Sequence, residues 1–97
     1  MCGIIGINSS RPVSSTIISS LKKLEYRGYD SAGIATLSNN EINEVKSEGR
    51  VDNLENNLLV QKMEGTIGIG HVRWATHGLP NSINAHPHSS QNVSVVH

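Results

Sequence analysis

Residues 2–8 of this 97-residue chain read Cys-Gly-Ile-Ile-Gly-Ile-Asn, an almost wholly apolar run that predicts a buried β-strand. Residues 67–74, Ile-Gly-Ile-Gly-His-Val-Arg-Trp, form a second strand-like run. Since side chains alternate along a strand, His71 and Arg73 share one face of this second strand and Trp74 lies on the other. The first run begins at the second residue, so we expect the start of the chain to lie against the core.

Helices and a hairpin are predicted between these two runs. The first predicted helix has Pro12 at its first position and ends at Gly28. Its apolar stripe consists of Val13, Ile17, Leu21 and Leu24. A second stripe predicts one helix that ends at Gly65; its members are Val51, Leu54 and Leu58. Residues 31–38 and 41–47 flank Asn39-Asn40, a pair suited to a two-residue hairpin turn, and we expect the second arm to be a partly exposed edge strand.

The end of the chain predicts a polar loop over residues 75–91 and a last strand over residues 92–97. The resulting order is β-α-β-β-α-β-β. Local hairpins mixed with helices indicate an α+β fold rather than a doubly wound parallel sheet.

Composition excludes several classes of protein. Eight Lys and Arg balance eight Asp and Glu, so neither nucleic acid nor an anionic membrane is an expected partner. The sequence has neither the long apolar run of a membrane span nor a signal peptide, and we expect a cytoplasmic protein. A single cysteine excludes an internal disulfide and a cysteine-built zinc site.

Cys2 is a candidate nucleophile because removal of Met1 would leave it with a free α-amine. An α-amine has an ordinary pKa of about 7.7–8.0, so a sizeable neutral fraction exists at pH 7 and can accept the thiol proton. One residue would then supply both nucleophile and base. The alternative is a small buried apolar residue at the start of the chain.

Arg73 stands at the end of its strand, where its planar guanidinium is placed to bind a carboxylate. The alternative is an ordinary surface ion pair. The loop that follows, Trp74 to Gly78, has the composition of a segment that closes over a small polar ligand, although a structural turn fits equally well.

Two other patterns are weak. The four histidines between residues 71 and 88 (His71, His77, His86 and His88) match no standard metal-site spacing, and we expect no metal. The glycines of residues 65–70 lead into a strand rather than a helix, which argues against a phosphate loop.

Several stretches together resemble class II glutamine amidotransferases: residues 2–6 (CGIIG), 24–33 (LEYRGYDSAG), 71–78 (HVRWATHG) and 84–88 (NAHPH). The last three are similar to the branch of this family that forms amino sugars from fructose 6-phosphate. Other branches share the N-terminal cysteine and the arginine-bearing strand without the WATHG…NAHPH pairing. Another class II amidotransferase is the alternative within the family.

The resemblance implies the αββα sandwich of N-terminal-nucleophile hydrolases and a reaction with L-glutamine. Cys2 would attack the side-chain amide, form a γ-glutamyl thioester and release ammonia. Arg73 would hold the α-carboxylate of the substrate. Trp74, Thr76 and His77 would belong to the loop that covers glutamine.

By the same resemblance, Arg27 and Asp30 fall in a segment near the partner domain that accepts ammonia, where a coupling role is expected. We expect residues 1–97 to be a truncated glutaminase domain without the sugar isomerase domains. An Asn-Gly pair of the oxyanion hole would follow His97, and a later aspartate would bind the substrate amino group. Fructose 6-phosphate would be reached only through the missing isomerase half, the complete protein would be a homodimer, and no cofactor is implied.

Two classes of function follow for these 97 residues. The first is the nucleophile-bearing part of a glutamine-hydrolysing enzyme, weakly active or inactive without the rest. The second is a non-catalytic remnant that binds glutamine or packs against another chain.

Overall fold

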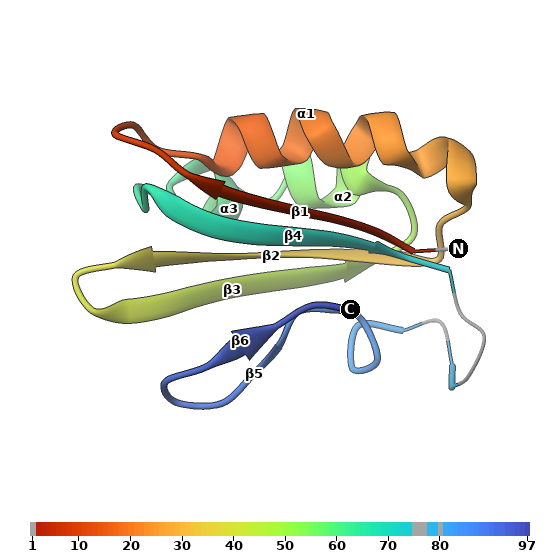
Figure 1. Cartoon of the computed structure of the whole chain (residues 1–97). Coiled ribbons are helices and arrows are strands. Elements are labelled where there is room, and N and C mark those ends of the chain that lie inside the picture. The colour runs from red at the N-terminus through yellow and green to blue at the C-terminus, as the bar shows by residue number, and fades with distance from the viewer. Residues whose placement is uncertain (1, 75–77, 80) are drawn as a thin grey trace.

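The structure is a computed structural model, and it describes residues 2–74, 78–79 and 81–97 (Figure 1). Its main sheet contains β1 (Gly3–Asn8), β2 (Ser31–Ser38), β3 (Glu41–Glu48) and β4 (Ile67–Arg73). The strands lie in the order β1-β4-β2-β3, and every neighbouring pair is antiparallel. The α+β prediction is therefore confirmed.

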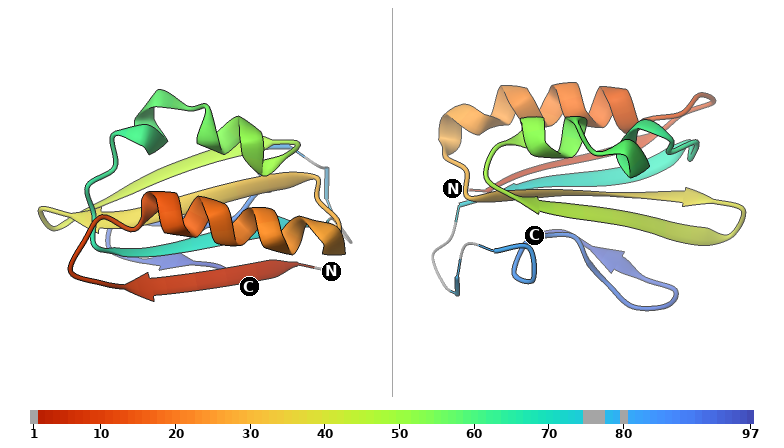
Figure 2. Two further views of the ribbon diagram at one scale, coloured as in Figure 1. Left: turned by 90° about the horizontal axis from the view of Figure 1, so that it is seen from above. Right: turned by 180° about the vertical axis from the view of Figure 1, so that it is seen from behind.

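Helices cover one face of this sheet. They are α1 (Ser14–Leu24), a 3-10 helix (Glu25–Arg27), α2 (Val51–Glu55) and α3 (Leu58–Gln61). The longest helix, α1, packs on β1 and β4, while α2 packs on β2 and β3 (Figure 2). A small hairpin of β5 (His88–Ser89) and β6 (Ser94–Val95) lies on the opposite side of the sheet (Figure 1). Within the described residues, no helix is long and apolar enough to cross a membrane.

The core lies between α1 and the sheet. Ile17 and Leu21, from the predicted stripe of α1, are fully buried, and each contributes roughly 1.5–3 kcal/mol by leaving water. Two glycines of β4 let α1 approach closely: a Cβ at Gly70 would lie 2.5 Å from Ile17 Cγ2, and one at Gly68 would lie 2.7 Å from Ile17 Cδ1. Gly68 and Gly70 thus serve helix packing, whereas a Cβ at Gly65 would meet the Leu37 carbonyl of β2 at 2.6 Å.

The hairpin prediction is confirmed. Asn39 and Asn40 have φ angles of 52° and 62°, as the turn requires, and β3 is an edge strand. The prediction that the first strand is buried is wrong in part, because β1 lies at the other edge of the sheet. Ile5 packs against the core, whereas Ile4, on the face away from α1, is 50% exposed.

The predicted single helix over residues 51–65 is also wrong, because the chain forms two short helices there. Asn57 is the N-cap of α3, and its side-chain oxygen accepts a hydrogen bond from the Leu59 amide. This local hydrogen bond competes with continuation of α2. As a result Leu58 is 67% exposed, and Val60 takes the buried position instead.

Smaller differences occur at two other boundaries. Pro12 lies before the helix, which starts at Ser14 after an N-cap at Val13. The strand predicted over residues 92–97 is reduced to β6, which pairs with β5 inside the predicted loop.

Candidate active site at the end of β1 and β4

The strand register brings the start of the chain beside the end of β4. Gly3 pairs with Val72 and Ile4 with His71, so the same antiparallel register sets Cys2 opposite Arg73. Gly3 and Val72 face the helices. Because side chains alternate, the side chains of Cys2 and Arg73 both project toward the β5–β6 side.

A pocket of about 350 Å³ opens on that side, lined by Cys2, Arg73, Trp74, Asn84, His86, His88 and His97. The Cys2 thiol lies 4.0 Å from the backbone oxygen of Trp74. The pocket thus combines a thiol from the start of the chain with a guanidinium from the end of a central strand. A site with these two groups suits a ligand that carries a carboxylate and an electrophilic carbon.

The Arg73 side chain is held from two sides. It is 7% exposed, and its Nη1 donates a hydrogen bond of 2.9 Å to the Leu79 carbonyl. The same Nη1 lies 3.6 Å from Oδ1 of Asp30. Sequence reasoning weighed a surface ion pair for Arg73, whereas the structure gives a buried pair at the pocket wall.

The structure describes some of the other predicted site residues but not all of them. Trp74 is 49% exposed and lies against Gly28, where a Cβ would come within 2.9 Å of the indole ring. Arg27 is exposed at the end of the 3-10 helix. Thr76 and His77, assigned to the substrate-covering loop, lie outside the described residues.

A cluster of imidazoles around His86 is a feature that the sequence analysis missed. The ring of His86 stacks on His71 at 4.3 Å between centroids and contacts His88 at 4.4 Å and His97 at 4.5 Å. From the sequence, His71, His86 and His88 were considered only as a poor metal pattern, and His97 was not included. Among the residues that the structure describes, no group of His, Cys, Asp and Glu is arranged to hold a metal ion.

The two buried imidazoles of this cluster are neutral at pH 7. Burial, with neighbouring His71 and His88 adding to it, lowers the pKa of His86 to about 4. Burial also lowers the pKa of His71, although its hydrogen bond to the His97 backbone acts in the opposite direction. The Nε2 of His71 donates to the His97 carbonyl at 2.7 Å, since a carbonyl only accepts. The Nδ1 atoms of both rings are buried and have no hydrogen-bond partner in the described part of the chain.

This cluster predicts a loss of stability in mild acid. The unfolded chain binds protons at His86 near the ordinary pKa of 6.5, whereas the folded chain does so only near 4. The stability that the neutral His86 contributes is therefore complete above pH 6.5 and is lost as the pH falls toward 4, with a loss of roughly 2 kcal/mol between pH 7.5 and 5.0. Urea unfolding at pH 7.5 and 5.0 measures it. A His86→Gln variant should lose less stability over this interval than the unsubstituted protein, and an equal loss in both would contradict the assignment.

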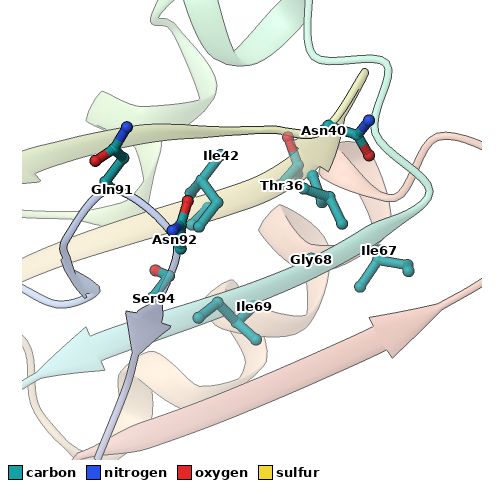
Figure 3. A pocket seen from close by; sticks show the side chains of 11 residues that line it. Thr36, Asn40, Ile42, Ile67, Gly68, Ile69, Gln91, Asn92 and Ser94 are labelled. Carbon is teal, nitrogen blue, oxygen red and sulfur yellow. The ribbon is translucent and has the colours of Figure 1, made fainter.

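A second hollow, of about 280 Å³, lies between the sheet and the β5–β6 hairpin (Figure 3). Apolar side chains such as Ile67 and Ile69 line its sheet side, and Asn92 and Ser94 face them from the hairpin. Among the described residues, its lining contains no cysteine and no charged group. We therefore place the candidate active site at Cys2 and Arg73.

Comparison with known proteins shows close relatives, although no family model matches the chain. The chain is 55% identical over 97 residues to a glutamine–fructose-6-phosphate aminotransferase [isomerizing] of Mesorhizobium japonicum and 54% identical to that of Bradyrhizobium diazoefficiens. A relative of the same name from Clostridium acetobutylicum is 54% identical over 99 residues. Each alignment covers the whole of this chain and 16% of the relative, so the chain spans about a sixth of their length.

Two solved structures share this fold. The glutamine phosphoribosylpyrophosphate amidotransferase of B. subtilis superposes with a TM-score of 0.75 at 25% identity, over 97% of this chain and 20% of that one. A second structure, described as the allosteric regulatory enzyme of purine biosynthesis, gives a TM-score of 0.77 at 28% identity. It covers 90% of this chain and 18% of that one.

Proposed function

The chain is a homologue of the glutamine–fructose-6-phosphate aminotransferases and has the N-terminal-nucleophile fold of glutamine amidotransferases, and from this premise we propose that it carries the glutamine-hydrolysing nucleophile. The observation that supports the proposal is the shared pocket of Cys2 and Arg73. Glutamine has an α-carboxylate at one end and an amide carbon at the other. A buried guanidinium and a thiol match these two groups.

The proposed chemistry begins after removal of Met1. The Cys2 α-amine accepts the thiol proton, and the sulfur attacks the amide carbon of glutamine. The C–N bond then breaks as the amine returns a proton to the departing nitrogen, which leaves as ammonia. Water attacks the resulting γ-glutamyl thioester, the C–S bond breaks, and glutamate and the thiol are released.

The proposal also assigns roles to the other predicted site residues. Trp74 borders the pocket and, with Thr76 and His77, would cover bound glutamine. Arg27 and Asp30 would couple hydrolysis to the domain that uses ammonia. In the complete protein the ammonia would convert fructose 6-phosphate to glucosamine 6-phosphate, within a cytoplasmic homodimer.

Substitution of Arg73 tests the pocket as a glutamine site. In the complete native protein, Arg73→Gln should raise KM for glutamine roughly 100-fold, because a buried charge-assisted contact to the substrate carboxylate is lost. The carboxylate is bound in the ground state and the transition state alike, so kcat should change much less. Steady-state glutaminase kinetics measure both values.

Arg11→Gln is the matched control, because Arg11 is exposed and does not line the pocket. Its KM should equal that of the unsubstituted protein. An unchanged KM in Arg73→Gln would contradict the assignment of Arg73. Glutamine binding without hydrolysis in the unsubstituted protein would instead favour a non-catalytic binding module.

A further inference from the structure

Asp30 lies directly behind the arginine of the pocket. Its Oδ1 is 3.6 Å from Nη1 of Arg73, and the two side chains are 12% and 9% exposed respectively. An ion pair this deeply buried interacts far more strongly than one at the surface, where water screens the charges. Loss of one partner is correspondingly costly.

Asp30 is itself fixed in place by its backbone and by its side chain. Its backbone N–H donates to the Arg73 carbonyl at 2.8 Å, and its own carbonyl accepts from the Gly49 amide at 2.8 Å. The hydroxyl of Ser31, which is fully buried, donates to Oδ1 at 2.8 Å. Asp30 is therefore tied to the end of β4 by its backbone and to the start of β2 by its side chain.

The fixed Asp30 carboxylate restricts the side chain of Arg73. An unrestrained arginine side chain has large rotamer entropy, part of which is lost when it binds a ligand. The Asp30 carboxylate and the Leu79 carbonyl contact the same Nη1 from different segments and so restrict the guanidinium before substrate arrives. Binding by a pre-positioned group loses less entropy.

We propose that Asp30 is a positioning residue that holds the guanidinium of Arg73 in the orientation that binds the α-carboxylate of an amino-acid amide substrate. This role rests on the proposed function and deepens it. It differs from coupling to a partner domain, because it acts on substrate binding within these 97 residues. It also differs from a simple charge effect: the negative charge of Asp30 repels a substrate carboxylate, so its removal alone would lower KM.

The sign of the change in KM therefore decides between these roles. Asp30→Asn keeps the size of the side chain and an oxygen that accepts from Ser31, which protects the fold. In the complete native protein, KM for glutamine should rise about tenfold, with kcat within about twofold of the unsubstituted value. Asp30→Glu, which restores the charge, should recover part of the loss.

A substrate without an α-carboxylate separates positioning from a structural defect. With 4-aminobutanamide, the decarboxylated analogue of glutamine, kcat/KM of Asp30→Asn should equal that of the unsubstituted protein. In an Arg73→Gln background, Asp30→Asn should likewise cause no further rise in KM for glutamine. Asp52→Asn is the control, since Asp52 is exposed on α2 and pairs with Lys22.

Three results would overturn the role of Asp30: an unchanged or lower KM for glutamine, an equal loss with the decarboxylated analogue, or an additive loss in the Arg73→Gln background. Loss of ammonia transfer with normal glutamine hydrolysis would leave Asp30 with the coupling role alone. Failure of the proposed function has a different signature, because the unsubstituted protein would then hydrolyse no glutamine.

Discussion

Replacement of Cys2 by Ala should abolish glutamine-dependent synthesis by the complete protein and leave ammonia-dependent synthesis intact. The thiol is the only group proposed to form the bond to the amide carbon, so the expected loss of glutaminase kcat is roughly 10⁴-fold or more. External ammonia bypasses this step. Parallel assays with glutamine and with an ammonium salt measure the two activities in the same preparation.

Alanine is an informative replacement because it keeps the second residue small. Removal of Met1 should proceed as before, so the α-amine stays in place and only the thiol is lost. The ammonia-dependent activity of the same variant is the internal control for folding. If both activities survive the substitution, Cys2 is not the nucleophile.

Gly33→Ala should destabilise the fold strongly. Gly33 lies in β2 opposite His71, and a Cβ at this position would be 1.8 Å from the backbone oxygen of His86 and 2.8 Å from Pro87 Cδ. The contact is with backbone, which cannot rotate away. The segment with His86 must therefore move, and we expect a loss of more than about 3 kcal/mol in the free energy of unfolding.

Gly6→Ala is a matched control, since Gly6 is also in a strand of the same sheet. Among the described residues, a Cβ at Gly6 would lie near only Ile69 Cγ2, at 3.9 Å. Urea unfolding of the two variants should give a large loss for Gly33→Ala and a change within about 0.5 kcal/mol for Gly6→Ala. Equal stability of the two variants would show that the 86–88 segment does not pack on β2 as described.

The regular elements were predictable where one physical signal dominates. The stripe of α1 has the helical period, and Asn39-Asn40 tolerates the positive φ angles of its turn. The break between α2 and α3 was not predictable from periodicity, because the side-chain hydrogen bond of Asn57 decides it. The exposure of β1 depends on its position at the sheet edge, which requires the order of the strands.

The candidate site likewise has parts that could be predicted from the sequence and parts that could not. Cys2 and Arg73 were recognisable from their chemistry and from the resemblance, and the β1–β4 register then brings them together. Asp30 lies next to Arg73 through the pairing of β2 with β4, a contact 43 residues apart in sequence that no local pattern encodes. The His86 cluster likewise forms only when the chain after β4 folds back under the sheet.

The nucleophile at Cys2 is tested most directly by intact-mass measurement of the native protein before and after treatment with an electrophilic glutamine analogue. We expect the mass to show loss of Met1 and then a single adduct, which peptide mapping places on Cys2 and excess glutamine prevents. A folded protein that retains Met1, or that forms no glutamine-protected adduct at Cys2, would contradict the proposed function.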